Sequence, residues 1–237
     1  MIKLETHCHL KGGSVCAHAP IDVGISEYKR DGYDGVVLTN HIHPLFYNRD
    51  YPGSTHKEKM DYWFSLADKF TELGRKAGIK TFIGAEIYAR LDDGRYTEFM
   101  IYGFDRKFLY DNKPLFELTQ RELFTLAEKN NIFMYQTHPC RARVITSDPQ
   151  YLHGAEKFNG HILHQNNNEQ AIKFCMENNL KCMSGTDYHD EGQTIIGGIY
   201  IPDDINNESE LADYLLNNQP KIIEEEERYR KFYKGTL

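Results

Sequence analysis

The sequence has no long hydrophobic run and no surplus of basic charge. No apolar stretch approaches the ~20 residues that a helix needs to cross a bilayer, so no membrane partner is expected. Lys and Arg number 28 against 35 Asp and Glu, which gives a formal net charge of −7. Because binding polymeric nucleic acid requires a basic face, this balance disfavours such a partner. A small phosphorylated substrate remains compatible, since bound metal cations can dominate the local field.

The chain also lacks a disulfide pattern and a recognisable leader. Its five cysteines are irregularly spaced and form no Cys-x-x-Cys pair, which disfavours a disulfide framework. The first residues show neither the basic nor the apolar region of a signal peptide, so a cytoplasmic location is expected. No linker, repeat or low-complexity tract divides the 237 residues. We therefore expect one domain spanning residues 1–237, a length that single α/β barrels commonly have.

Short apolar runs alternate with amphipathic stretches along most of the chain. The apolar runs predict buried strands, and apolar residues near a 3.6-residue spacing predict helices. This alternation predicts an α/β fold in which helices cover a parallel sheet, either doubly wound or closed into a barrel. The expected strands are 2–5, 35–39, 80–85, 99–103, 132–136, 154–158, 181–184 and 198–201. The expected helices are 21–31, 58–77, 115–130, 169–178, 209–217 (capped by Ser209) and a charged C-terminal helix at about 222–237.

Histidines and carboxylates follow five of the expected strands. In a barrel the C-terminal ends of the strands face one mouth, where the loops build the active site. These side chains would therefore converge although they are far apart in the sequence. They are His7 and His9 after the first strand, His41 after the second, Glu86 after the third, His138 after the fifth, and Asp187 and His189 after the seventh.

The residue types in this set point to metal binding. His7 and His9 are two apart on an extended segment, so both point to one face and can grip one ion. Asp187 and His189 repeat that arrangement. Imidazole and carboxylate ligands together suit Zn²⁺, Mn²⁺ or Fe, and a carboxylate such as Glu86 can bridge two ions. A single histidine at a strand end is usually a surface or capping residue, but the whole set in this order predicts a metal site.

Six segments resemble the PHP (polymerase and histidinol phosphatase) domain family, and together they span nearly the whole chain. The resemblance implies a distorted seven-stranded (β/α) barrel, similar to a TIM barrel, that holds up to three metal ions and cleaves phosphate esters. The segments are His7-Cys8-His9, Leu38-Thr39-Asn40-His41, Gly84-Ala85-Glu86-Ile87, Thr137-His138-Pro139, Gly154-Ala155-Glu156-Lys157-Phe158-Asn159-Gly160 and Gly185-Thr186-Asp187-Tyr188-His189.

The same resemblance implies a ligand set for two or three ions of Zn, Mn or Fe. Glu98 lies where the family often has a histidine for the second ion, and His18 lies in the loop that usually adds a ligand to the third. Asn40 replaces the usual aspartate before His41, which leaves that histidine a neutral partner. The implied ligands are His7, His9, Glu86 and Asp187 for the first ion, Glu86, His138 and Glu98 for the second, and His41, His189 and His18 for the third.

Hydrolysis of a phosphate ester, with a small phosphomonoester favoured, is the function that these residues predict. Bound ions would lower the pKa of a water and supply the nucleophile for attack on phosphorus, and the expected catalytic residues are Glu86, Asp187 and His189. Arg141 and Arg143 are suited to bind the phosphate, although a solvated pair on a loop is the simpler alternative. Three other functions stay open: a non-catalytic metal-binding or regulatory module, a phosphodiesterase or nuclease, and an amidohydrolase-type hydrolase.

Overall fold

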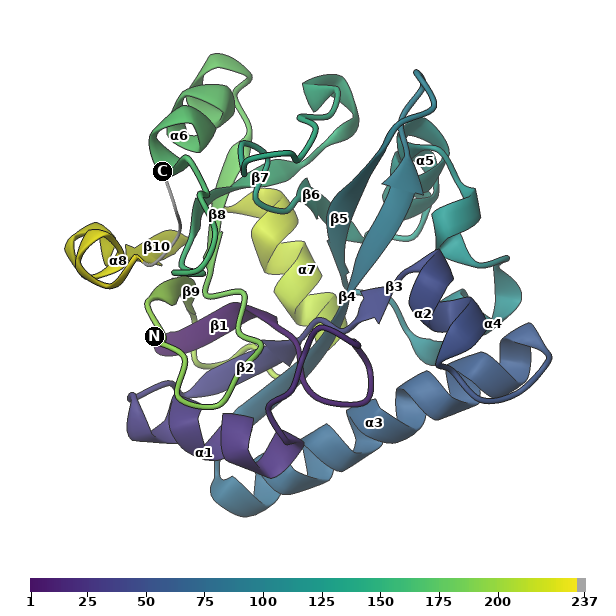
Figure 1. Ribbon diagram of the computed structural model, residues 1–237, viewed down its shortest axis with the longest axis horizontal. Coiled ribbons are helices and arrows are strands. Elements are labelled where there is room, and N and C mark those ends of the chain that lie inside the picture. Colours follow the sequence, from purple (N-terminus) through teal and green to yellow (C-terminus); the bar gives the residue numbers. More distant parts are fainter. Residues whose placement is uncertain (234–237) are drawn as a thin grey trace.

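The computed structural model describes residues 1–233 and shows a mixed α/β fold whose sheet curves into a nearly closed barrel (Figure 1). The strands are β1 (Ile2–Cys8), β2 (Gly35–Leu38), β3 (His41–Ile42), β4 (Lys80–Arg90), β5 (Tyr96–Tyr102), β6 (Phe133–Gln136), β7 (Gly154–Asn159), β8 (Lys181–Gly185), β9 (Gly197–Ile201) and β10 (Lys221–Glu224). The helices are α1 (Ile21–Arg30), α2 (Pro44–Arg49), α3 (His56–Ala77), α4 (Arg106–Asp111), α5 (Gln120–Lys129), α6 (Asn168–Glu177), α7 (Glu208–Asn217) and α8 (Glu226–Phe232), with short 3-10 helices η1 (Leu115–Glu117) and η2 (Pro149–Tyr151).

The described strands form one ten-stranded sheet in the order β10-β9-β1-β2-β4-β5-β6-β7-β8, with β3 paired to β4. The last strand of this order, β8, approaches β1 and β10 through side-chain hydrogen bonds. The hydroxyl of Thr6 in β1 donates to the carbonyl of Ser184 in β8, at 2.5 Å. The hydroxyl of Ser184 donates to the carbonyl of Ile223 in β10, also at 2.5 Å. The barrel-like α/β fold is thus confirmed, whereas the predicted count of seven strands is not.

The strands are not all parallel, which corrects the expectation from the βα alternation. β5 runs antiparallel to β4 and β6, and β9 runs antiparallel to β1 and β10. The sequence between β4 and β5 is a tight turn, with Gly94 at φ 86°, so no helix returns the chain to the start of the next strand. β4 and β6 still point the same way, and their C-terminal ends reach the same mouth.

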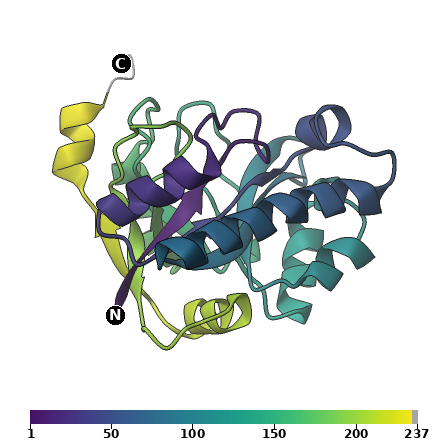
Figure 2. The ribbon, with the colours of Figure 1, turned by 90° about the horizontal axis from the view of Figure 1, so that it is seen from below.

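The end of the barrel opposite the mouth is filled by apolar side chains, which we call the base core. Helix α7 lies across this end, on the far side of the sheet from the loops of the mouth (Figures 1 and 2). Burying these groups supplies the hydrophobic stabilisation of this half. The base core contains Leu4, Val37, Phe82, Met100, Tyr102, Phe133, Tyr135 and Met183 from the strands and Leu211, Ala212 and Leu215 from α7.

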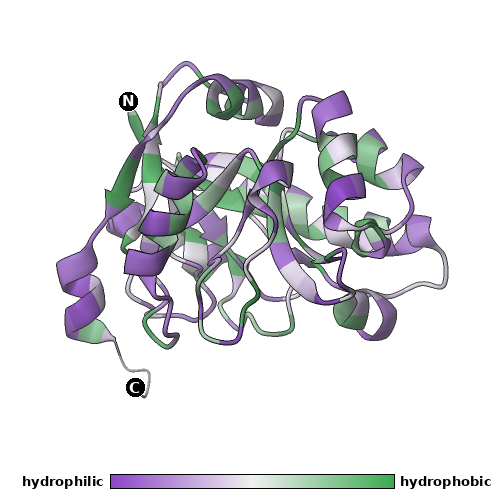
Figure 3. Cartoon of the chain, turned by 90° about the horizontal axis from the view of Figure 1, so that it is seen from above, coloured by the Kyte–Doolittle hydropathy of each residue, from purple (hydrophilic) through white to green (hydrophobic). Residues whose placement is uncertain are grey.

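The remaining long helices cover the outside of the barrel, and their ends follow from the sequence. α3 begins with a capping box between Thr55 and Glu58 and ends at Gly78, which adopts φ 67°, a left-handed conformation that glycine adopts readily. Trp63 and Phe70 are buried on its inner face. Figure 3 shows hydrophilic residues on the outer turns of the helices, and α8 is mainly hydrophilic. None of the helices in residues 1–233 combines the length and the apolar composition that crossing a membrane requires.

Several predicted helix boundaries were wrong. The helix expected at 115–130 breaks at Thr119, because this residue caps α5 in a capping box with Glu122. α7 is capped by Asn207, whose side chain accepts from the Glu210 amide, and Ser209 lies inside the helix. The charged C-terminal segment begins with β10, and only Glu226–Phe232 is helical. Residues 234–237 of that predicted helix lie outside the described residues, and the single-domain organisation stays a prediction.

Candidate metal centre

Buried histidines and carboxylates from six parts of the sheet meet at the mouth of the barrel. His7 and Glu86 lie inside β1 and β4, because both strands run further than predicted. His41 in β3 pairs in register with Glu86. Glu98 in β5 lies opposite Tyr88, and since side chains alternate along a strand, Glu86 and Glu98 point to the same face of the β4–β5 ribbon. His9, His138, Asp187 and His189 follow the ends of β1, β6 and β8.

Glu86 lies between two pairs of histidines. Its Oε1 is 3.5 Å from His7 Nε2 and 3.4 Å from His138 Nε2. Its Oε2 is 3.3 Å from His9 Nε2 and 3.1 Å from His41 Nδ1. Each oxygen of one carboxylate therefore faces a different set of imidazoles, which is the arrangement that a carboxylate shared by two ions requires.

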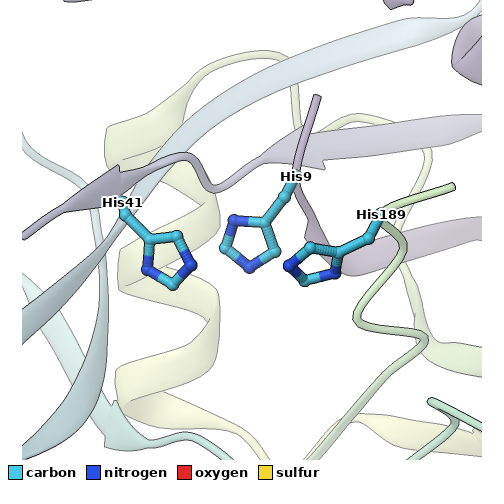
Figure 4. A group of neighbouring side chains, drawn as sticks. All are labelled: His9, His41 and His189. Carbon is cyan, nitrogen blue, oxygen red and sulfur yellow. The ribbon is translucent and has the colours of Figure 1, made fainter. Parts of the chain in front are cut away.

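Three histidines also form a row across the mouth. His9 lies between the other two, with its ring centroid 4.3 Å from that of His41 and 4.5 Å from that of His189 (Figure 4). The Nε2 atoms of His7 and His9 are 3.0 Å apart, so the pair does point to one face as its spacing predicts. The two nitrogen atoms are close enough for a single cation to accept a lone pair from each.

Asp187 joins the cluster and is held by Arg141. Its Oδ1 lies 3.3 Å from His7 Nε2 and 3.4 Å from His189 Nδ1. Its Oδ2 accepts from Arg141 Nη2 at 2.5 Å and from Asn159 Nδ2 at 3.3 Å. Arg141 is thus at the mouth, as predicted for a phosphate-binding residue, but one of its hydrogen bonds is already used to orient a carboxylate.

The pKa values of three histidines favour the neutral imidazole. Burial lowers the pKa of His189 to about 4, and the nearby His9 adds to this effect. Burial, then His9, holds the pKa of His41 well below its usual range. Burial, then Arg141, lowers the pKa of His138. A neutral imidazole keeps a nitrogen lone pair free, and that is the form that binds a metal.

The carboxylates give the centre a negative charge. Burial alone would raise the pKa of Glu86 and of Asp187. The neighbouring groups together, His7 first in both cases, outweigh burial and hold each pKa well below its usual range. Burial and the Glu86 charge raise the pKa of Glu98 to about 8. Burial alone would lower the pKa of His7. The charges of the nearby carboxylates, Asp187 first, instead raise this pKa well above its usual range. The centre therefore attracts positive charge.

The residues present fit divalent metal ions. Glu86 Oε1 and His41 Nδ1 are buried and have no hydrogen-bond partner, which is costly unless another group satisfies them. Histidine and carboxylate form the donor set of Zn, Mn and Fe sites. Four groups have ligand atoms within 4.8 Å of one another: His9, His41 and His189; His7, His138 and Asp187; His7, His9 and Glu86; and His41, Glu86 and Glu98.

Two residues of the cluster have strained backbones. His138 adopts φ 31° and Asp187 adopts φ 56°, a region that non-glycine residues rarely occupy. Such strain persists where surrounding structure enforces it and gathers at functional sites.

Gly185 permits the close approach of β8 to β1, because a Cβ atom there would lie 2.4 Å from the Cβ of His7.

The structure does not bring His18 or Arg143 into the cluster. The His18 side chain is 73% exposed, and its Nδ1 lies 2.7 Å from Asp190 Oδ1, so its place as a ligand of the third ion has no support in the geometry. Arg143 is exposed as well. Glu98, in contrast, lies 3.8 Å from His41 Nδ1 and 3.7 Å from His138 Nε2, where a ligand for a second ion would be needed.

Glu156 is a residue of the centre that the sequence did not single out. It is fully buried, and its Oε1 lies 2.9 Å from His7 Nδ1. Its Oε2 accepts from the backbone amide of His138 at 2.8 Å and from Asn159 Nδ2 at 2.9 Å. A carboxylate on Nδ1 fixes the ring so that Nε2 faces the cluster. The signal available was the segment 154–160, which carried the family resemblance without a role for this glutamate.

His161 is a further buried histidine near the centre. Only 5% of it is exposed, and its ring centroid lies 5.5 Å from that of His189. Burial lowers the pKa of His161 to about 3. Its position in a polar stretch gave no sign of burial, because the loop after β7 folds back over the mouth.

Solved structures share this fold. A two-domain protein from Bacteroides vulgatus that contains a predicted PHP-like metal-dependent phosphoesterase is 21% identical, with a TM-score of 0.61; the match covers 94% of this chain but only 64% of that one. PsfC from Pseudomonas syringae is 16% identical over 96% and 93% of the two chains, with a TM-score of 0.65. The lesion-specific endonuclease PfuEndoQ from Pyrococcus furiosus is 13% identical over 93% and 57%, with a TM-score of 0.55.

These comparisons identify the class of fold. No family model matches the sequence, and no curated protein matches it either. At these identities the likeness establishes the fold alone. The chain shares its fold with a predicted PHP-like metal-dependent phosphoesterase and with a putative metal-dependent phosphoesterase from Bifidobacterium adolescentis, which confirms the resemblance seen in its motifs. The shared fold by itself assigns no catalytic role to any residue of this chain.

Proposed function

We propose that this protein is a metal-dependent hydrolase of phosphate esters, with small phosphomonoesters as the favoured substrates. The observation that carries the proposal is Glu86, a buried carboxylate whose two oxygens face separate histidine pairs and whose Oε1 has no hydrogen-bond partner. The proposed ligands are His7, His9, His41, Glu86, Glu98, His138, Asp187 and His189. Two or three ions of Zn, Mn or Fe and a cytoplasmic location remain predictions.

The residues of the centre have separate roles in this proposal. Bound divalent ions would supply a water of lowered pKa and would offset charge on the phosphate oxygens. Glu156 fixes the ring of His7 through Nδ1. Arg141 orients Asp187 through Oδ2 and adds a positive charge beside the place where a phosphate would lie. The neutral imidazoles of His41, His138 and His189 offer lone pairs rather than protons.

A phosphodiesterase or nuclease is the second candidate. It is favoured by the shared fold with the Pyrococcus furiosus endonuclease, which leaves a nucleic-acid substrate open for this chain. The net charge of −7 argues against a long polymer. An amidohydrolase-type enzyme is disfavoured, because such enzymes commonly use a bridging modified lysine, whereas Glu86 holds the central place here.

Hydrolysis of p-nitrophenyl phosphate and bis(p-nitrophenyl) phosphate, with and without added Mn²⁺, tests the proposal. His9→Ala is expected to lower activity about 100-fold or more, since it removes a central ligand, and to lower the metal content. His18→Ala is the matched control and is expected to retain both, because His18 is exposed. Cleavage of the monoester confirms the favoured function, and cleavage of the diester alone favours the second candidate. A wild type that binds no metal contradicts the proposal.

A further inference from the structure

A row of aromatic rings runs from the metal centre along the β4–β5 ribbon. It begins beside His41 and includes His43, Phe46, Tyr88 and Tyr96, which we call the aromatic strip. The ring centroid of Phe46 lies 5.4 Å from that of His41 and 4.8 Å from that of His43. His43 and Tyr88 are 4.4 Å apart by the same measure, and Tyr88 and Tyr96 are 5.2 Å apart. The strip thus connects the cluster with the surface.

The strand geometry puts this strip on the same face as the ligands. Glu86 and Tyr88 are two apart on β4, and Tyr96 and Glu98 are two apart on β5, so all four point to one face. Tyr88 and Tyr96 are diagonal neighbours across the two strands, because Tyr88 pairs with Glu98. β4 and β5 extend past the neighbouring strands as a long ribbon (Figure 1), and the tyrosines lie on this extension.

The outer part of the strip is open to solvent. Tyr96 is 40% exposed and Leu45 of α2 is 50% exposed, while His43, Phe46 and Tyr88 are partly buried. The rings of Tyr88 and Tyr96 are nearly parallel, with 9° between their planes. α2 begins directly after β3, the strand that carries His41, and supplies Phe46 to one side of the strip.

We propose that the aromatic strip binds a planar ring in the leaving group of the substrate, so that the preferred phosphate esters carry an aromatic or heteroaromatic group. This inference rests on the phosphoesterase function proposed above. A phosphate at the cluster would place its ester substituent toward the mouth, where the strip starts. Planar rings stack on aromatic side chains in offset or edge-to-face arrangements, and an exposed tyrosine has a free face for such contact. Aryl phosphates and nucleoside monophosphates share this chemistry.

Two esters of the same chain length, one with a planar ring and one with a saturated ring, test the inference. 2-Phenylethyl phosphate and 2-cyclohexylethyl phosphate are both primary alkyl esters with leaving groups of closely similar basicity. We expect the phenyl ester to have about a three- to tenfold higher kcat/KM through a lower KM. Tyr96→Leu is expected to bring the ratio of the two kcat/KM values close to one, and Tyr96→Phe is expected to keep the ratio of the wild type. Equal kcat/KM values for the two esters in the wild type, or a preference that Tyr96→Leu leaves intact, overturn the inference.

Calorimetry with the matching phosphonates separates this inference from the proposed function. If neither ester is hydrolysed, the phosphoesterase function fails for these substrates, but binding of 2-phenylethylphosphonate and 2-cyclohexylethylphosphonate to the Mn²⁺-loaded protein still decides about the strip. Tighter binding of the phenyl compound that Tyr96→Leu abolishes supports it, and equal or absent binding overturns it. O-phosphotyrosine and adenosine 5′-monophosphate then distinguish a ring near the phosphate from one held at the far side of a sugar.

Discussion

The two ends of the barrel are equally buried but chemically opposite. Phe82 and Glu86 lie four residues apart on the same face of β4, and each is 1% exposed. Phe82 packs in the base core, whereas Glu86 has a buried oxygen without a partner. Burial stabilises the first side chain and penalises the second. The base therefore serves stability, and the mouth retains an arrangement that is unfavourable without a ligand.

The largest effect expected from this comparison is at the base. Phe82→Ala should lower the free energy of unfolding by about 3–5 kcal/mol, because it leaves a cavity in the base core. Glu86→Gln, four residues further along the strand, should lower the stability of the metal-free protein by less, because the loss of the carboxylate's interaction with His7 is partly offset by the removal of a buried charge. Urea denaturation of both variants measures this, and a larger loss for Glu86→Gln than for Phe82→Ala would contradict it.

Glu5 lies where the two regions meet, and it should make stability depend on pH. Burial raises the pKa of Glu5 from 4.5 to about 7, so the folded protein holds a proton that the unfolded chain releases. The stabilisation that Glu5 contributes is present in full below pH 4.5 and is lost as pH rises through about 7. Its size is about 3 kcal/mol. Denaturation of the metal-free protein at pH 5 and pH 8 should show this loss relative to Glu5→Gln.

Glu5→Gln is a suitable reference because Oε1 of Glu5 accepts from the amides of Thr6, His7 and Thr186, and glutamine keeps that acceptor. Equal pH dependence in the wild type and the variant would mean that the Glu5 pKa is not raised.

The smallest of these effects concerns Glu156, which fixes the orientation of the His7 ring at the mouth. Glu156→Gln should weaken metal binding about 10- to 100-fold, because an amide nitrogen would face either His7 or the donors of His138 and Asn159. Titration of metal-free protein with Mn²⁺ measures the affinity. Glu128→Gln is the matched control, since Glu128 pairs with His153 at the surface, at 2.5 Å. An equal loss in both variants would contradict a positioning role for Glu156.

The sequence predicts the mouth better than it predicts the barrel around it. Residues of the cluster such as His7, His41 and His138 could be found because strand ends in a βα alternation face one side. The antiparallel β5 and β9 could not, since alternation alone does not distinguish a hairpin from a crossover. Part of the strand β10 was taken for helix because its four residues are too few to show a strand period and run directly into the charged residues of α8.

Contacts between distant segments were also beyond the sequence. Arg141 has a phosphate-binding residue type, but its hydrogen bond to Asp187 depends on how two loops meet. The exposure of His18 could not be predicted either, because spacing in the sequence does not fix the direction of a loop side chain.

The central claim is that the mouth of the barrel binds metal ions between Glu86 and its histidines. The most direct test is anomalous X-ray diffraction from crystals of the protein loaded with Mn²⁺ or Zn²⁺, recorded on both sides of the metal absorption edge. The account predicts at least two anomalous peaks within coordination distance of Glu86, one near His7 and one near His41. Peaks found only at surface residues such as His18, with the mouth empty, would contradict it.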